Sequence, residues 1–230
     1  MTATNLRVGR ENKGWTQQQA AERLGVSQAY LSLLENGTRR LTERLARRAR
    51  ALYDMSPTVL PVQSSGDDVY AAEENRAAGD LAALGYSAFS YLTGGKKKKN
   101  PAEVVASLLK ARDLDARLTE ALPWLLLEYP DLDWNWLARV SKVHDLQNRL
   151  GFVTTLALRL AETKGNRHAR EVLAQQRSNL ERSRLAREDT LCHESLSEAE
   201  KNWLRENRPP AARHWNLLTD LSVEHLNYGA

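Results

Sequence analysis

The sequence predicts an all-α protein, in which a small N-terminal bundle of short helices is joined by a linker to a larger helical domain. Residues that favour helices dominate, and helix-capping patterns recur along the chain. Runs of β-branched residues, which favour strands, are absent from the larger domain. Two prolines and several small polar residues lie between Ser56 and Asp68, without periodicity. We therefore expect domains at residues 1–56 and 69–230, with a linker at 57–68.

The composition is that of a globular protein with one or two domains. Of the 230 residues, 42% are hydrophobic and 27% are charged. The single cysteine, Cys192, has no partner for an intrachain disulfide, which excludes a small disulfide-stapled fold and fits a reducing cytoplasm. No stretch approaches the ~18 apolar residues that span a bilayer, and the N-terminus carries no apolar signal core. The sequence therefore predicts a cytoplasmic protein with no membrane contact.

Positive charge is concentrated near the N-terminus. Residues 1–60 hold ten Lys and Arg and five Asp and Glu, an excess of +5, whereas residues 61–230 hold 23 and 24, a balance of −1. This asymmetry favours an anionic partner for the first domain. The near-neutral remainder argues against a second extensive nucleic-acid surface and favours a protein partner.

Turn and capping residues divide the first domain into four or five short helices between Asn5 and Tyr53. The first helix is expected to end at residues 12–14, and Thr16 is a suitable N-cap for a second helix that runs to Leu24.

Further stop and start signals follow at regular intervals. Gly25 stands where a left-handed C-cap would end the second helix. Ser27 then caps a third helix that runs to the stop signal Asn36-Gly37, and Thr42 begins a fourth helix.

The larger domain is expected to contain six or seven helices and no sheet. Asn100 is an N-cap candidate followed by a proline, and Ser197 begins a capping-box pattern. Apolar residues recur at helical spacing from about residue 133 to 164, which predicts one long helix with a buried face. Another helix is expected from about residue 168 to 189.

The first domain has the spacing of a helix-turn-helix unit. Ala20 and Ala21 place small side chains where the second helix of the unit must cross close by, and Gly25 allows the tight turn. Ser27, Gln28, Ala29, Tyr30 and Ser32 then project from the N-terminal part of the second helix, which is the end that enters the major groove of DNA in this geometry. The shared core is filled by three apolar side chains, Val26, Leu31 and Leu34.

A longer pattern surrounds this unit. It consists of Trp15-Thr16-Gln17, Ala20, Leu24-Gly25-Val26-Ser27, Leu31-Ser32 and Leu34-Glu35-Asn36-Gly37. On these residues, segment 5–56 resembles the Xre/Cro-repressor-type helix-turn-helix family. The resemblance covers less than a quarter of the chain and implies a DNA-binding domain.

The resemblance also implies roles for individual residues. Gln17 opens the first helix of the unit and would bind a backbone phosphate and orient a neighbour. The residues after the turn would read base edges, a role that transfers to Gln28, Ala29 and Tyr30. The full set expected to contact DNA is Gln17, Gln18, Ser27, Gln28, Ala29, Tyr30, Ser32, Asn36, Arg39 and Arg40.

Gln28 is the strongest single candidate for reading a base, because an amide can bond both N6 and N7 of adenine. Ser32 and Asn36 are expected nearer to the DNA backbone. Arg39 and Arg40 follow the recognition helix and are expected to grip phosphate.

Leu33 departs from the family pattern, which usually has a polar or basic residue at this position. Either it contacts a thymine methyl group or it packs on another chain, and the sequence leaves both open.

An aromatic segment in the larger domain has two interpretations. It contains Trp124, Trp134 and Trp136, and Pro123 and Pro130 are expected to break or kink its helical path. The segment is either a packed helix–loop–helix elbow in the core or an exposed patch for a protein partner, since Trp and Tyr are enriched at interface hot spots.

A basic run, Lys96–Lys99, follows Gly94-Gly95. It lacks the spacing and the following Ser or Thr of a phosphate-binding loop. A solvated loop is the simpler interpretation, and an auxiliary DNA contact is the alternative.

The sequence contains no catalytic or metal-binding constellation. Its five histidines do not combine with cysteines at zinc-ligand spacing. Cys192 and His193 are adjacent and usually would point apart, which does not suit a nucleophile and its base. The polar residues between His144 and Arg149 are expected to form a polar face or a buried hydrogen-bond network. We therefore expect a protein that is not an enzyme and has no cofactor or metal.

Together these inferences predict a sequence-specific transcriptional regulator, a repressor that binds double-stranded DNA as a homodimer. The plan of the chain is similar to that of bacterial regulators and of antitoxins that repress their own operons, in which the second domain binds the toxin. The alternatives are a phage-type or ligand-sensing regulator, and a protein-interaction module whose helix-turn-helix does not bind an operator.

Overall fold

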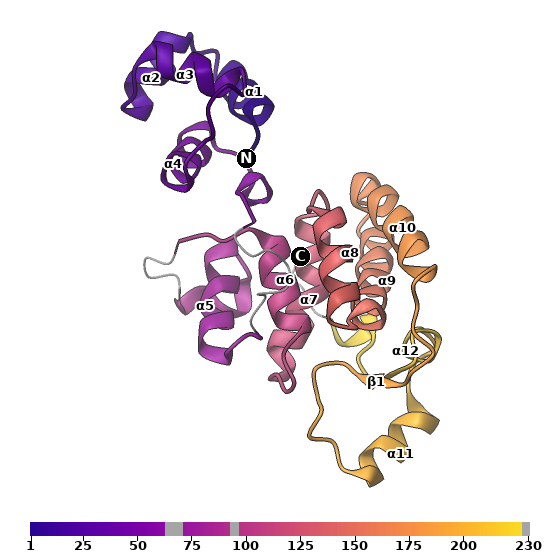
Figure 1. The fold of residues 1–230 in the computed structure, drawn as a ribbon. Coiled ribbons are helices and arrows are strands. Elements are labelled where there is room, and N and C mark those ends of the chain that lie inside the picture. The colour runs from indigo at the N-terminus through magenta and orange to yellow at the C-terminus, as the bar shows by residue number, and fades with distance from the viewer. Residues whose placement is uncertain (63–70, 93–96, 227–230) are drawn as a thin grey trace. The chain divides into compact units, whose positions relative to one another are not determined.

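The chain folds into two compact units, Met1–Gln63 and Ser64–Ala230, in a computed structural model that describes residues 1–62, 71–92 and 97–226 (Figure 1). Both units are built from helices, which confirms the all-α fold class. The expected linker, residues 57–68, begins with a short 3₁₀ helix, η1 (Pro57–Val59), and its residues 63–68 lie outside the described part of the chain.

Four α-helices form the N-terminal unit, and polar caps fix where each begins. The side-chain oxygens of Thr2, Thr16, Ser27 and Thr42 each accept a backbone N–H from the first turn of the helix that follows. The last three caps confirm the predicted helix starts. The helices are α1 (Ala3–Asn12), α2 (Gln17–Leu24), α3 (Gln28–Glu35) and α4 (Glu43–Tyr53).

The core of this unit is small and apolar. Small side chains at Ala20 and Ala21 let the helices approach closely, as predicted. Tyr53 and Trp15 meet edge to face, with their ring centroids 5.8 Å apart. The buried cluster consists of Leu6, Ala20, Ala21, Leu24, Leu31, Leu34, Ala49 and Tyr53.

The larger unit contains eight α-helices in its described residues, where six or seven were expected. Asn100 and Ser197 cap their helices as predicted, the latter in a capping box with Glu200. The elements are α5 (Glu74–Leu84), η2 (Ser87–Leu92), α6 (Pro101–Leu109), α7 (Ala116–Glu128), α8 (Trp134–Val143), α9 (Gln147–Thr163), α10 (Arg167–Glu181), α11 (Glu198–Asn207), α12 (Pro210–His214) and η3 (Val223–His225).

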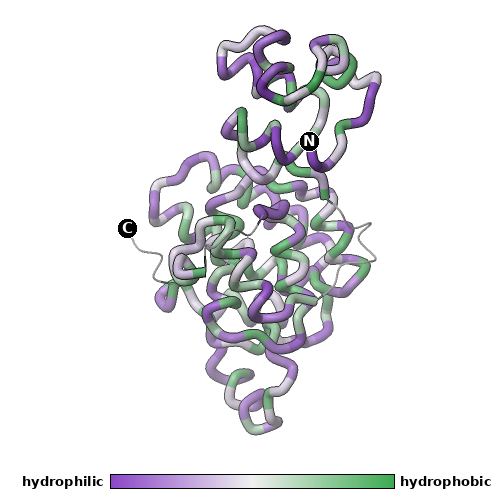
Figure 2. Tube along the Cα trace, turned by 90° about the vertical axis from the view of Figure 1, so that its left-hand side faces the viewer, coloured by the Kyte–Doolittle hydropathy of each residue, from purple (hydrophilic) through white to green (hydrophobic). Residues whose placement is uncertain are grey.

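Helix α9 is the centre of the larger unit. It packs against α7, α8, α10 and α12, and every residue from Gln147 to Leu158 is buried. Figure 2 shows hydrophobic residues along the inner turns of this unit and hydrophilic residues along its outer turns. A helix buried all round needs polar residues that find partners inside the protein.

The prediction of one long helix at residues 133–164 is wrong, because the chain forms two helices there, α8 and α9. The backbone leaves the helical region at His144 (φ −112°, ψ 13°), and Asp145 adopts a left-handed φ of 57°. Asp tolerates this conformation better than most residues. The backbone N–H of Leu146 then donates to the carbonyl of Ser141 at 2.7 Å and closes the turn between α8 and α9.

The helix expected at residues 168–189 ends early, at Glu181 in α10. The chain beyond it takes its hydrogen bonds from Asn148 on α9, whose amide donates to the carbonyl of Leu185 at 2.9 Å and accepts from the N–H of Leu185 at 2.8 Å. This side-chain pairing replaces the bonds that a longer helix would have made.

A small sheet also contradicts the prediction that the larger domain has none. Strand β1 (Asp189–Thr190) pairs in parallel with β2 (Leu217–Leu218). Each strand has only two residues, so no alternation of apolar and polar residues marks it in the sequence.

Trp215 packs directly on the backbone of α9. Its indole is fully buried and donates from Nε1 to Oγ1 of Thr155 at 2.9 Å, and Thr155 in turn donates to the carbonyl of Gly151 at 2.8 Å. A Cβ at Gly151 would lie 2.3 to 2.5 Å from three ring carbons of Trp215. Glycine at this position is therefore what lets the C-terminal segment dock on α9.

We expect Gly151→Ala to destabilise the larger unit by about 3 kcal/mol, because neither the rigid indole nor the buried helix has room to move. Urea unfolding followed by near-ultraviolet circular dichroism would measure the loss. Gly165→Ala is the matched control: a Cβ there meets no atom within 4 Å, and only the left-handed φ of 67° opposes it. Equal losses for the two variants would contradict the role given to Gly151.

Candidate nucleic-acid interface

Helices α2 and α3 are joined by a tight turn at residues 25–27. Gly25 ends α2 in the left-handed conformation, with φ of 70°, and the backbone N–H of Val26 donates to the carbonyl of Ala21 at 3.0 Å. The Ser27 hydroxyl accepts the N–H of Tyr30 at 3.2 Å and starts α3. Local sequence therefore sets the spacing and the entry angle of α3.

Helix α3 has one face in the core and one in solvent. Leu31, Leu34 and Glu35 are buried. With 3.6 residues per turn, the residues on the opposite side of the helix share a single outward face. We call this the outer face of α3, and it consists of Gln28, Ala29, Ser32, Leu33 and Asn36.

The predicted contact residues divide between this face and the core. Gln28 and Ala29 are exposed, and Leu33 is 40% exposed. Tyr30 is half-buried and packs against the core, so it lies at the edge of the outer face rather than on it. The amide of Asn36 donates to the Ser32 hydroxyl at 3.5 Å.

A polar network under α3 was missed by the sequence reasoning. The guanidinium of Arg10 on α1 forms a two-pronged ion pair with Glu35, from Nε at 2.7 Å and from Nη2 at 3.0 Å. The Glu35 side chain is only 1% exposed. The hydrogen-bonded pairing of Arg10 with Glu35 raises the pKa of Arg10. Oε2 of Glu35 also accepts from the amide of Gln17 at 3.0 Å. The network joins α1, α2 and α3 and orients Gln17 at the start of α2.

The one sequence signal for this network is Glu35 itself. It is an acidic residue that directly follows Leu33 and Leu34 at the C-terminus of a helix, where the helix dipole disfavours negative charge. A buried carboxylate in that position requires a cationic partner.

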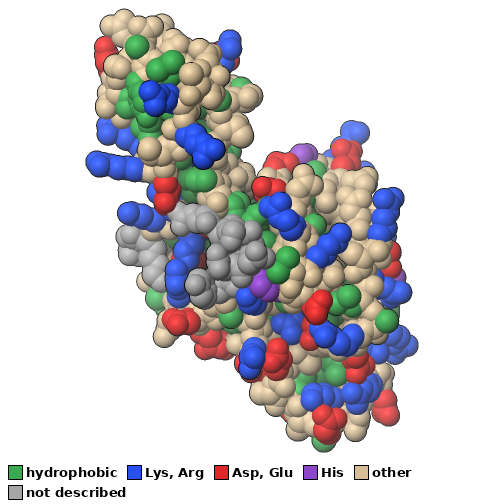
Figure 3. Space-filling model, viewed as in Figure 1, with side chains coloured by type: hydrophobic (Ala, Val, Ile, Leu, Met, Phe, Trp, Pro, Cys, Tyr) green, Lys and Arg blue, Asp and Glu red, His purple; other side chains and the backbone are tan. Residues whose placement is uncertain are grey.

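Several basic side chains of this unit project without a carboxylate partner. Arg39 and Arg40 follow α3, are exposed, and form no ion pair with any residue that the structure describes. Arg44, in the first turn of α4, is also exposed and forms no ion pair with the described residues, and it was not among the expected contacts. Arg7 and Arg47 instead pair with glutamates on their own helices. Figure 3 shows Lys and Arg side chains (blue) projecting from the N-terminal unit.

These features define the N-terminal unit as a helix-turn-helix domain. Residues 6–60 match the family model described as helix-turn-helix, which confirms the resemblance of this segment to Xre-type helix-turn-helix domains. The match supports a DNA-binding helix-turn-helix regulator, with double-stranded DNA as its partner. No curated protein and no solved structure matches the chain.

The aromatic segment of the larger unit is packed and does not form the exposed patch that was one of its two interpretations. Trp134 and Trp136 are 8% and 5% exposed. Trp124 is half-buried, and its ring centroid lies 5.0 Å from that of Tyr86. Of the two prolines expected to break or kink the helical path, Pro123 does not break it, because α7 continues through this residue, whereas α7 ends at Glu128, shortly before Pro130.

The basic run before α6 is only partly described. Gly94, Gly95 and Lys96 lie outside the described residues. Lys99 is half-buried and donates to Asp80 at 2.5 Å, so this lysine is not the freely solvated side chain that a solvated loop would supply.

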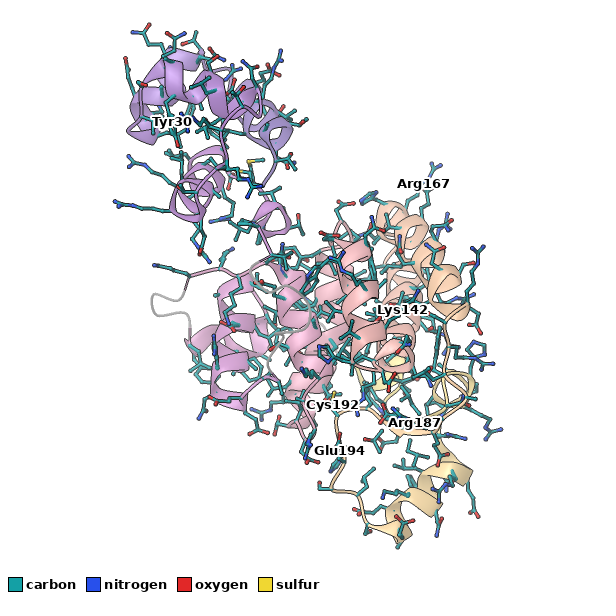
Figure 4. All side chains as sticks on the ribbon, viewed as in Figure 1. Tyr30, Lys142, Arg167, Arg187, Cys192 and Glu194 are labelled. Atoms are coloured by element: carbon teal, nitrogen blue, oxygen red, sulfur yellow. The ribbon has the colours of Figure 1, made fainter. Side chains whose placement is uncertain are left out.

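The polar residues at the start of α9 form the buried hydrogen-bond network that was one expectation for them. Arg149 makes a two-pronged ion pair with Asp189, and its Nη1 lies 3.9 Å from the sulfur of Cys192. Figure 4 shows Cys192 and Glu194 on the segment between β1 and α11. Burial raises the pKa of the Cys192 thiol to about 11, which disfavours the reactive thiolate.

The described residues contain neither a membrane-spanning helix nor a cluster of metal ligands. No helix among the described residues is long and apolar enough to cross a membrane. Within the same residues, no group of three or more His, Cys, Asp or Glu side chains is placed to hold a metal ion.

Glu35→Gln should destabilise the N-terminal unit by about 3 kcal/mol, because the largely buried guanidinium of Arg10 is left with only the exposed carboxylate of Glu11, at 3.5 Å, as a counter-charge. Amide hydrogen exchange of residues 17–35 in the full-length protein would measure the loss. Glu43→Gln removes an exposed carboxylate from the Arg47 pair on α4 and should leave exchange of residues 17–35 unchanged. Unchanged exchange in Glu35→Gln would contradict a stabilising role for the network.

Proposed function

We propose that this protein is a sequence-specific transcriptional repressor that binds double-stranded DNA as a homodimer. The observation that carries the proposal is the outer face of α3. In an Xre-type domain this helix lies in the major groove, and here its outer face is exposed and contributes nothing to the core.

Gln28 is suited to direct reading of a base. It stands at the first position of α3, is exposed, and its amide makes no hydrogen bond with the part of the chain that the structure describes. An amide can donate to N7 of adenine and accept from N6 at the same time. Both amide atoms must then be free of hydrogen bonds to the protein. Leu33 on the same face supplies an apolar surface for a thymine methyl group.

Phosphate contacts would surround this base contact. Gln17, held by Glu35, and the unpaired guanidinium groups of Arg39 and Arg40 flank α3. Such contacts set the position of the protein on the duplex, and the base contact sets the sequence.

The dimer is part of the proposal because one small domain buries too little surface for tight specific binding. Two copies reading half-sites about one helical turn apart overcome this limit. The larger unit, residues 64–230, is the proposed site of dimerisation and of any protein partner.

An autoregulating antitoxin is a narrower form of the same proposal. It adds that the partner of the larger unit is a toxin whose binding changes operator affinity. A neighbouring toxin gene, and a toxin that copurifies with this chain, would support the narrower form over a phage-type or ligand-sensing regulator.

A mobility-shift assay with the full-length protein tests the proposal. The DNA upstream of its own gene should shift at lower protein concentration than random DNA of equal length. No shift at low salt would overturn DNA binding, and a shift without sequence preference would overturn the specific repressor.

Gln28→Ala should weaken binding to the cognate site by roughly 1–3 kcal/mol while leaving random DNA nearly unaffected, because a bidentate base contact is lost. Titrations on both DNAs at one salt concentration would measure the difference. Equal losses on the two DNAs would contradict base reading by Gln28.

Arg39→Ala should weaken binding to all sequences alike and reduce the slope of log K against log salt by about one, because one phosphate contact is lost. Arg7→Ala, at an exposed arginine that is paired with Glu11, is the matched control and should leave the slope unchanged. An unaltered slope in Arg39→Ala would remove this residue from the phosphate-binding set.

A further inference from the structure

The larger unit contains a cavity of about 510 Å³ that neither the helix-turn-helix domain nor the proposed repressor function uses. It is lined from four separate stretches of chain: the start of α7, residues 191–196, α11, and residues 218–225. Its size is that of a small-molecule pocket.

The body of the cavity is apolar. Six of the sixteen lining residues are leucines, which come from all four stretches, and most of the lining surface is apolar. Examples from three of them are Leu191, Leu204 and Leu221, which are all buried. An apolar lining of this kind favours a ligand with a hydrocarbon body.

Hydrogen bonds hold one wall of the cavity, the 191–196 stretch, in place. The backbone N–H of Leu114 donates to the carbonyl of Cys192 at 3.0 Å, and the N–H of Glu194 donates to the carbonyl of Arg112 at 3.0 Å. The carboxylate of Asp113 accepts the N–H of Ser195 at 2.9 Å. These bonds hold the 191–196 stretch against the segment that leads into α7.

The charged groups of the lining are acidic. Glu120, Glu200 and Asp220 line the cavity, and no Lys or Arg does so among the described residues. Two histidines, His193 and His225, also line it. Even with both imidazoles protonated, three carboxylates leave the lining with a net negative charge.

Two of these carboxylates, Glu200 and Asp220, form no ion pair with a Lys or Arg of the described residues. Hydrogen bonds from Ser197 lower the pKa of Glu200, which keeps it ionised. Asp220 is exposed and forms no ion pair with the residues that the structure describes.

An exposed aromatic ring completes the site. Trp203 on α11 lines the cavity and is 56% exposed, which is high for a side chain of this size. Figure 1 shows α11 at the end of an extended segment, beside the helical bundle of this unit. A tryptophan face next to carboxylates is a favourable surface for an organic cation.

We propose that this cavity binds a small amphipathic organic cation, with its hydrocarbon body against the leucines and its ammonium group among the carboxylates and Trp203. The apolar lining accounts for the body of the ligand, and the acidic lining accounts for its charge. This site does not depend on DNA binding, so each proposal stands or fails by its own experiment.

Isothermal titration calorimetry of the full-length protein with decylammonium, decanoate and decanol tests the proposal, because these probes share one hydrocarbon chain and differ in head-group charge. Decylammonium should bind with one equivalent per chain and about tenfold more tightly than decanoate, with decanol between them. Glu200→Gln and Asp220→Asn should each raise the dissociation constant for decylammonium about threefold to tenfold and leave that of decanol unchanged.

Both variants are expected to fold. Glutamine at the third position of α11 preserves the capping box with Ser197, and asparagine has the shape of Asp220. Glu206→Gln is the matched control, because this exposed glutamate is on α11 but does not line the cavity. Absent binding of decylammonium, equal or tighter binding of decanoate, or equal effects of Glu200→Gln and Glu206→Gln would each overturn the proposal. Equal binding of all three probes would indicate an apolar groove for a protein segment instead.

Discussion

The buried ion pair between Arg149 and Asp189 is the interaction on which the larger unit depends. Nε and Nη2 of Arg149 lie 2.8 and 2.9 Å from the Asp189 carboxylate, and Nη1 donates to the carbonyls of Leu109 and Ala111. One side chain of α9 thereby holds the end of α6 and strand β1. Removing the Asp189 carboxylate would leave the buried guanidinium of Arg149 with only the exposed carboxylate of Glu194, at 3.7 Å, as a counter-charge, which is unfavourable. The non-helical chain after α10 becomes ordered through this pair, and the wall of the cavity begins two residues beyond Asp189.

The N-terminal unit also contains a buried ion pair between an arginine and a carboxylate, Arg10 and Glu35. It has about sixty residues and therefore a limited apolar core, so capping and one buried ion pair matter more to its stability. The Arg10–Glu35 pair both ties three helices together and positions Gln17. Because one carboxylate serves both purposes, the stability of the domain and the orientation of a predicted phosphate contact are physically linked.

The sequence could predict features that are set by neighbouring residues. The caps Thr16, Ser27 and Thr42, and the turn at Gly25, were all predictable because each acts within three residues of itself along the chain. The break at Asp145 was not predicted, because apolar residues continue at helical spacing on both sides of the turn that the N–H of Leu146 closes.

The candidate site follows the same division. The outer face of α3 follows from helical periodicity alone, whereas Arg10 and Glu35 are 25 residues apart and meet only in the folded domain. The cavity requires four stretches between residues 114 and 225, and the docking of Trp215 on Gly151 requires the two to meet across 64 residues. Nothing local in the sequence marks such encounters.

For the outer face of α3, the separation from the core has an evolutionary consequence: Gln28, Ala29 and Leu33 can be exchanged without disturbing a cap, the ion pair or the apolar cluster. The domain can therefore acquire a new binding preference by substitution on one helical face, while its thermodynamic stability is inherited unchanged.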